Sequence, residues 1–587
     1  MKNYFAKADL HVHSRASNQP AGWFTSLLEC AESYTEPLEI YYTLKERGMN
    51  FITITDHNTI EGVLEIAHFP EVFISCEYTV KVPEEEAFVH VLVYGIEEKH
   101  HEDLLKLREN LYEFVSYLKV YSFPYVLAHP FYPINGTKIT KKFIEKMILL
   151  FDNWELINGA RGNKTSYLEE RILRKYDGWE NIRKLEERYN MKSLRTRDKI
   201  SFTAGSDDHS GLYVGTTKTL VEKASDIESF LKGLFEGRTK IETENLNNEI
   251  LFNMVAKVGY NCFERKYFFP AELKPFLDYM FMESHKNLQI SYILRYLFGI
   301  NNNGELPLKT VMNQLPFLAL NKFIQKPNLQ GLGEVIISFL LHILPIFLKL
   351  FHKKEEERVY SLAKAFEIEY KKPIKIAYFT DTYFDINGVA RTAQIIREIL
   401  KEENLPFTII TVSERAYREE KFITLKGYYS FAFPFYKDFN LYIPSFLELT
   451  DLITSEEFIH LHIATPGPLG IMAFIIGKLL GHIITFAYHT DLPNYAKIYT
   501  NDEEVENLFW KTLISLINNS DLCFVPSNYY KEILENKGVA THKLKVFKRG
   551  VNIGLFSPHK REKYYWNKEL GLPEEAKIIL QKLIPMP

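Results

Sequence analysis

The stretch Asp9-Leu-His11-Val-His13-Ser14 decides what the first part of the chain can fold around. Side chains two residues apart on an extended strand point to the same face, so both imidazoles aim at one point. Two such histidines form half of a metal site, and a pair of strand histidines without a metal is the alternative. A metal-bound imidazole needs a partner for its other ring nitrogen, and Asp9 or Asp56 is a candidate for this role.

Further candidate ligands lie within or at the ends of apolar, strand-like runs. They are His57, Glu77, His90, His129, Asp207 and His209. Taken singly, a histidine in an apolar strand is more often an ordinary core residue than a ligand. Their joint occurrence at strand ends indicates a shared site, because loops at the carboxyl ends of strands carry the chemistry of α/β folds.

A set of histidine, aspartate and glutamate ligands without thiolates permits zinc, manganese or iron. Several such ions suit phosphate ester hydrolysis, because they bind phosphoryl oxygens and lower the pKa of a bound water. Glu77 is a candidate to bridge two ions. Arg15, directly after the first motif, is the candidate to grip a phosphoryl oxygen, with Arg161 as a second candidate. Exposed loop arginines without such a role are the alternative for both.

The pattern of apolar residues divides the chain into three parts. Residues 1–245 alternate strand-like and helical segments, which predicts an α/β domain with a parallel sheet or barrel. Residues 246–372 are helical in pattern and predict a connector. Residues 373–587 begin as strand, glycine-containing loop, helix and strand, which is typical of a doubly wound parallel-sheet domain.

In this order, the motifs DLHVHS, TDHN, AHP and SDDH resemble the polymerase and histidinol phosphatase (PHP) superfamily. The resemblance implies a distorted (β/α)7 barrel with two or three metal ions and phosphatase or phosphodiesterase activity. It assigns one ion to His11, His13, Glu77 and Asp207, a second to Glu77, His90 and His129, and a third to His57, His209 and the position of Asn18. Asn18 departs from the family, which often has aspartate or histidine there, and a neutral amide is a poor ligand.

Residues 373–558 resemble the amino-terminal half of retaining family 4 GT-B glycosyltransferases. The resemblance rests on FTDTYFDINGVART from Phe379, HIATPGPLG from His462, YHTDLPNYAKIY from Tyr488, VPSNYY from Val525 and KRGVNIGLFSP from Lys548. It implies acceptor binding, with Gly388, His489 and Asp491 as substrate-binding residues. The donor-binding half of that fold is expected to be missing, through either a shortened gene or a genuine half-domain.

Net charge, cysteine spacing and one apolar stretch indicate which partners and which cellular compartment to expect. A net charge of -4 over 587 residues provides no general field for capturing nucleic acid. Four widely spaced cysteines argue against a disulfide framework and favour the cytoplasm. The apolar stretch Val335–Phe351, interrupted by His342, Pro345 and Lys349, predicts a buried or membrane-surface helix. A peripheral position at the inner membrane face is therefore the second expectation.

The leading hypothesis is a metal-dependent phosphoesterase whose glycosyltransferase-like module binds a phosphorylated small molecule, a sugar phosphate or a glycolipid. A glycosyltransferase that carries the PHP domain as an accessory is one alternative. A non-catalytic scaffold with structural metals is the other.

Overall fold

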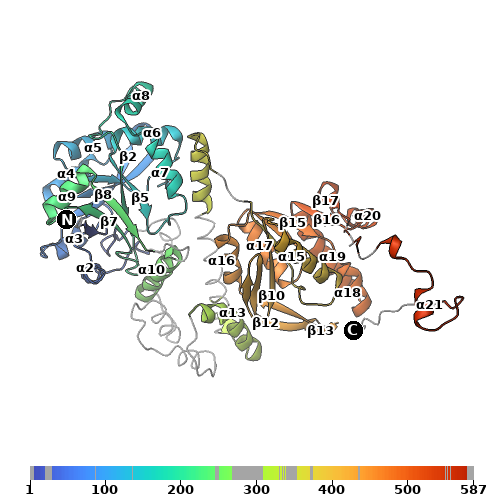
Figure 1. The fold of residues 1–587 in the computed structure, drawn as a ribbon. Coiled ribbons are helices and arrows are strands. Elements are labelled where there is room, and N and C mark those ends of the chain that lie inside the picture. Colours follow the sequence, from blue (N-terminus) through green and yellow to red (C-terminus); the bar gives the residue numbers. More distant parts are fainter. Residues whose placement is uncertain are drawn as a thin grey trace. The chain divides into compact units, whose positions relative to one another are not determined.

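The computed structural model describes residues 5–19, 30–244, 250–266, 308–328, 331–332, 335, 338, 353–370 and 374–577, except 86, 135, 434–435, 549, 551–552 and 555–556. The chain forms two compact units (Figure 1). The first consists of residues 1–306 and 347–371, and the second of residues 307–346 and 372–587. The segment predicted as a connector therefore contributes to both units.

The larger sheet of the first unit has the strand order β2-β3-β4-β5-β6. The strands are β2 (Ser75–Val82), β3 (Ala87–Tyr94), β4 (Tyr125–Leu127), β5 (Asn153–Asn158) and β6 (Ser201–Gly205). β3 runs antiparallel to β2 and β4, whereas β4, β5 and β6 are parallel. The sheet is thus mixed and not purely parallel, because the short connection between β2 and β3 leaves no room for a crossover helix.

A smaller antiparallel sheet has the order β1-β7-β8 and comprises β1 (Phe5–Ala8), β7 (Thr217–Glu222) and β8 (Thr239–Thr243). The first metal motif begins directly after β1. It is not part of a regular strand, but Val12 forms an isolated bridge with Asp208. A second isolated bridge joins His57 to Glu77. These bridges bring motifs that are distant in the sequence to one place.

Helices pack around these strands (Figure 1). They are α2 (Pro37–Glu46), α3 (Glu61–Ile66), α4 (Glu98–Leu107), α5 (Leu111–Val120), α6 (Lys141–Leu150), α7 (Ser166–Arg174), α8 (Trp179–Tyr189), α9 (Ile227–Glu236) and the 3-10 helix η1 (Pro83–Glu85). In α5, Leu111, Phe114, Val115 and Leu118 are buried, the spacing of one helical face. Each such face closes part of the core.

Two segments from beyond residue 245 complete the first unit. Ile250 and Met254 of α10 (Ile250–Lys266) pack with Ala160. Residues 353–365 are helical, and Val359 and Phe366 belong to the main hydrophobic cluster of the unit. Both segments belong to the core, so the first unit extends past the predicted boundary.

Cys30 and Cys262 form a disulfide that ties α10 to the loop before α2. This corrects the prediction that the cysteines are unpaired, whereas Cys76 and Cys523 are free and buried. The two paired cysteines are 232 residues apart, so their spacing in the sequence carries no sign of the contact.

The second unit is built on a long sheet with the order β11-β12-β10-β9-β14-β15-β16-β17, in which β13 pairs with β12. The strands are β9 (Ile376–Phe379), β10 (Phe407–Ser413), β11 (Tyr417–Glu419), β12 (Phe422–Phe433), β13 (Tyr436–Pro444), β14 (His460–Ile463), β15 (Ile483–Ala487), β16 (Leu522–Val525) and β17 (Leu544–Val546). The pairs of β11 and β13 with β12 are antiparallel, and the other pairs are parallel. The predicted parallel sheet is confirmed.

The helices of this unit are α13 (Leu308–Gln325), α15 (Gly388–Glu402), α16 (Phe446–Ser455), α17 (Pro468–Leu479), α18 (Leu492–Thr500), α19 (Glu503–Asn518), α20 (Asn528–Asn536) and α21 (Tyr565–Glu569), with the 3-10 helices η2 (Thr541–Lys543) and η3 (Pro558–Lys560). None of the helices in the described residues is both long enough and apolar enough to cross a membrane. Apart from Val335 and Ser338, the stretch 335–351 lies outside the described residues.

Candidate metal centre

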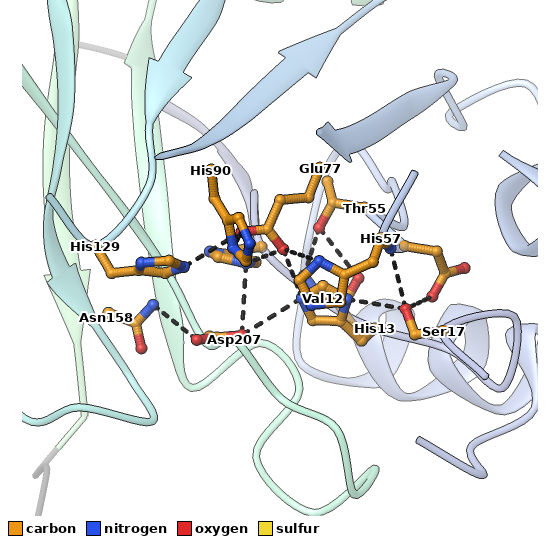
Figure 2. Close-up of polar contacts among 12 residues, drawn as sticks. Val12, His13, Ser17, Thr55, His57, Glu77, His90, His129, Asn158 and Asp207 are labelled. Atoms are coloured by element: carbon orange, nitrogen blue, oxygen red, sulfur yellow. Dashed lines mark hydrogen bonds and ion pairs between the residues drawn. The ribbon is translucent and has the colours of Figure 1, made fainter. Parts of the chain in front are cut away.

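Loops and strands of the first unit bring all eight predicted metal ligands into one cluster. Figure 2 shows His13, His57, Glu77, His90, His129 and Asp207 of this cluster. His11 and His13 follow β1, and His57 precedes α3. Glu77 and His90 lie on the paired strands β2 and β3. His129 follows β4, and Asp207 and His209 follow β6. The predicted residues therefore come from six separate places in the sequence and meet.

Glu77 lies at the centre of the cluster and is fully buried. Its Oε2 lies 3.2 Å from His11 Nε2, 3.3 Å from His13 Nε2 and 3.1 Å from His57 Nδ1. Its Oε1 lies 2.8 Å from His90 Nδ1 and 3.3 Å from His129 Nε2. Each carboxylate oxygen thus faces a different set of imidazoles, which is the arrangement that a carboxylate bridging two ions requires.

Asp207 supplies the second carboxylate. Its Oδ1 lies 3.4 Å from the Nε2 atoms of His11 and His13 and 3.6 Å from His209 Nδ1. Asn158 Nδ2 donates to Asp207 Oδ2 at 3.0 Å (Figure 2). The backbone N–H of Asp207 donates to the carbonyl of His11 at 2.7 Å, and its φ is +50°. These bonds hold the aspartate in an uncommon backbone conformation that points it at the cluster.

Four groups of three side chains have ligand atoms within 4.8 Å of one another. They are His13, His57 and His209; His11, His129 and Asp207; His11, His13 and Glu77; and His57, Glu77 and His90. Two ligands bound to one ion at about 2.0–2.2 Å with tetrahedral angles lie roughly 3.3 Å apart. The separations around Glu77 and Asp207 are close to this value.

Several polar atoms of the cluster are buried and have no hydrogen-bond partner among the described residues. They are Nε2 of His11, Nε2 of His13, Oε2 of Glu77 and Nδ1 of His90. Burying a polar atom without a hydrogen-bond partner costs free energy of folding. A bound cation would offset this cost by accepting these atoms as ligands. The donor set of nitrogens and carboxylate oxygens fits zinc, manganese or iron.

The electrostatics of the cluster favour a bound cation. Burial raises the pKa of Glu77, but the imidazoles of His11, His57 and His90 outweigh it and hold that pKa well below its usual range. Burial lowers the pKa of His11, but Glu155, Asp207 and Glu77 raise it well above normal. The buried carboxylates therefore favour positive charge in the centre, and a divalent ion would provide it.

Glu155 is a functional residue that the sequence reasoning missed. Its Oε1 lies 2.8 Å from His11 Nδ1, and its Oε2 accepts from the backbone N–H of His129 at 2.8 Å. It thereby leaves Nε2 of His11 to face the cluster and fixes the strand end that carries His129. The available signal was a carboxylate inside the apolar run NWELIN of β5.

The carboxylates predicted to orient the imidazoles, Asp9 and Asp56, act differently. In the described contacts neither bonds to an imidazole. Asp9 accepts from the backbone N–H groups of Ser206 and Gly215, at 2.9 and 2.7 Å. Asp56 accepts from Ser17 Oγ at 2.9 Å, and this hydroxyl lies 3.2 Å from His13 Nδ1. Both aspartates hold the loops of the centre together.

Arg15 and Arg161 differ in their availability for a substrate. Arg15 is paired with two carboxylates, Glu36 Oε2 at 2.5 Å and Glu65 Oε1 at 2.8 Å. The guanidinium of Arg161 lies over the ring of Tyr132, 3.6 Å from its centroid, and its Nε is 3.9 Å from Asp207 Oδ2. A cavity of about 310 Å³ beside the centre is lined by Arg161, His129 and Lys164 among others.

The predicted third-site residue Asn18 is not part of the cluster. It is exposed, and its side-chain oxygen accepts from Gln19 Nε2 at 3.0 Å. Glu32, which the sequence reasoning did not consider, lies with its Oε2 3.3 Å from His57 Nε2. Burial raises the pKa of Glu32 to about 7.

The substrate-binding residues predicted in the second unit lie at one edge of its sheet. Gly388 begins α15 after β9, and His489 and Asp491 follow β15. Both strands flank β14 and run parallel to it, so their carboxyl ends meet at the same edge. Asp491 caps α18 by accepting from the backbone N–H of Asn494 at 3.4 Å. Partial burial, together with the charges of His489 and His460, lowers the pKa of the half-buried His462 to about 3.

Comparison with known proteins supports the resemblance of the second unit. The family model of Glycosyltransferase Family 4 matches residues 386–555 of this chain. The sulfoquinovosyl transferase SQD2 of Arabidopsis thaliana is 27% identical over 216 residues. That alignment covers 35% of this chain and 41% of the relative, so the chain spans less than half of the length of SQD2.

Two solved structures are similar to parts of the chain. A protein from Bifidobacterium adolescentis described as a metal-dependent phosphoesterase has a TM-score of 0.23 and 16% identity, with 39% of this chain and 96% of that chain covered. Sucrose-phosphate synthase from Thermosynechococcus elongatus has a TM-score of 0.25 and 15% identity, with 34% of this chain and 53% of that chain covered. At these scores neither likeness bears on function, and membership of the first unit in the PHP superfamily stays a prediction.

Replacing Glu155 by glutamine should lower the affinity of the centre for Mn²⁺ about 10- to 100-fold, because the negative partner of His11 is lost. Titration calorimetry of the metal-free protein measures the effect. The control is Glu170→Gln, which removes a half-exposed carboxylate that pairs only with Arg174 in the described contacts. Equal affinities for both variants would show that Glu155 does not tune His11.

Proposed function

We propose that the first unit is a PHP-type phosphoesterase that hydrolyses phosphate esters with two or three divalent ions. One observation carries the proposal: the fully buried Glu77 presents each of its two oxygens to a different set of imidazoles. A purely structural core would not bury a carboxylate among five histidines, because the desolvation cost is large.

Zinc, manganese or iron ions in this centre would supply Lewis-acid activation of water and of phosphoryl oxygens. The residues of the chain have distinct parts in the arrangement. Glu77 and Asp207 provide negative charge between the imidazoles, and Glu155 keeps His11 in the orientation that faces the centre. Asp9 and Asp56 hold the loops in place by accepting backbone and hydroxyl hydrogen bonds.

The cavity next to the centre supports a phosphorylated substrate of small size. Its volume is about 310 Å³, at the lower end of ligand pockets. Arg161 lies against both Tyr132 and Asp207, so its guanidinium is fixed beside the metal ligands. A planar guanidinium suits two phosphoryl oxygens at once. We assign the phosphate contact to Arg161 because the guanidinium of Arg15 is taken up by Glu36 and Glu65.

To test the reaction, the full chain is loaded with Mn²⁺ or Zn²⁺ and assayed on phosphomonoesters and phosphodiesters. His11→Ala and Asp207→Ala should each lower turnover at least about 100-fold, since each removes a ligand and not only its partner. Chelation of the metal should abolish turnover, and added metal should restore it. Unchanged turnover in both variants contradicts the hydrolase proposal, and tight metal binding without any hydrolysis favours the scaffold alternative.

Arg161→Met should raise KM for the best substrate roughly 10- to 100-fold, because a charge-assisted hydrogen bond to phosphate contributes about 1.5–3 kcal/mol. Steady-state kinetics on the same substrate measure the change. Arg15→Met, which removes a guanidinium already paired with carboxylates, should change KM less than about twofold. The opposite order of effects would return the phosphate contact to Arg15.

A second candidate function is favoured by the family match of residues 386–555: binding and transfer of a sugar by the second unit. A cavity of about 390 Å³ lies at the carboxyl ends of β9 and β10, lined by Asp381, Asp385, Ser413, Arg415, Asn440 and Tyr442 among others. Carboxylates, an amide and hydroxyls are groups that bind sugar hydroxyls. Nucleotide sugars as donors, with a glycolipid or sugar phosphate as acceptor, follow from this proposal.

The sugar function is tested by incubating the chain with nucleotide sugars and measuring release of the nucleotide. His489→Ala should reduce the rate about tenfold or more if a hydrogen bond to the sugar is lost. His542→Ala, which changes an exposed histidine of η2, is the control and should leave the rate unaltered. Equal rates of nucleotide release in both variants would show that His489 does not contact the sugar.

A further inference from the structure

We propose that Glu32, and not Asn18, is the anionic ligand of a third cation bound with His57 and His209. The inference rests on the proposed metal centre and adds a residue to it. Neither the PHP motifs nor the family resemblance point to Glu32, which lies fourteen positions after Asn18 in the sequence.

The first step is the geometry around His57. Glu32 Oε2 lies 3.3 Å from His57 Nε2. This is roughly the separation of two ligands that share one ion at about 2.0–2.2 Å. His57, His13 and His209 in turn have ring nitrogens within 4.8 Å of one another. The carboxylate of Glu32 therefore lies on the Nε2 side of His57, whereas Glu77 faces its Nδ1.

The second step is how the chain holds Glu32 there. The backbone N–H of Ser33 donates to the carbonyl of Ser17 at 3.4 Å, and Ser33 Oγ donates to the carbonyl of His13 at 3.2 Å. The backbone N–H of Arg15 donates to the carbonyl of Thr35 at 2.8 Å. The loop that carries Glu32 is thus bonded to the first metal motif itself, and the position of Glu32 does not depend on the contact with His57.

The third step concerns charge. The side chain of Glu32 is 15% exposed, and its one ion-pair contact in the described residues is with His57. A divalent ion bound between the Glu32 carboxylate and His57 Nε2 would compensate the charge of this mostly buried carboxylate.

The fourth step excludes the alternative ligand within the described structure. Asn18 is exposed and its amide oxygen is used by Gln19. A neutral amide is also a weaker ligand for a divalent ion than a carboxylate. In this chain the carboxylate beside His57 comes from Glu32, and not from the position of Asn18.

The test counts metal ions. Metal-free full-length protein is equilibrated with Mn²⁺, freed of excess ion, and analysed for manganese per chain. We expect about three ions in the unaltered protein, about two in Glu32→Gln, and about three in Asn18→Ala. Glu36→Gln is the matched control, because it removes an exposed carboxylate four positions on and should also keep three ions.

The outcomes separate this inference from the proposed function. Three ions in Glu32→Gln overturn the inference alone, and would reduce Glu32 to a partner that orients His57. Two ions in the unaltered protein, or loss of an ion in Asn18→Ala, also overturn it. No bound metal in the unaltered protein overturns the metal centre itself. Circular dichroism checks the fold of each variant. Glu32→Asp keeps the charge but shortens the side chain by one methylene, so its affinity for the third ion should be at least about tenfold lower.

Discussion

A carboxylate buried without water requires a compensating positive charge, and Glu77 imposes this requirement on the first unit. It is fully buried and surrounded by five imidazoles, which hold its pKa well below the usual range. The loops after β1 and β4, the segment before α3 and the strand β3 each bring an imidazole to this one side chain of β2. Isolated bridges pair Val12 with Asp208 and His57 with Glu77, and so join the backbone segments that carry these ligands.

The ligands of the centre could be predicted because the signal is local: a histidine or carboxylate follows an apolar run, and strand ends meet at one edge. The parallel sheet of the second unit could be predicted for the same reason, from alternation of strand and helix. Glu155 and Glu32 could not. Glu155 acts through His11, which is 144 positions away, and Glu32 is placed by bonds between Ser33 and the first motif. A single sequence does not show such contacts, and the carboxylate inside the apolar run NWELIN marks Glu155 without naming its partner.

Two other features of the first unit also differ from the prediction. The hairpin of β2 and β3 makes the first sheet mixed, although each strand alone resembles a strand of a parallel sheet. The disulfide joins a loop to a helix that the sequence assigns to a separate connector. Short sequence motifs were therefore enough to predict the site. The limits of the units could not be predicted in the same way, because they depend on which distant segments pack together.

The two units exchange segments along the chain: residues 307–346 belong to the second unit but stand between two parts of the first. Cys262, Val359 and Phe366 all belong to the first unit from beyond residue 245. A fragment that ends at residue 245 would therefore expose an apolar face of the core and leave Cys30 without its disulfide partner. Expression of the first unit by itself therefore requires residues 347–371, joined to the end of α10 by a designed linker.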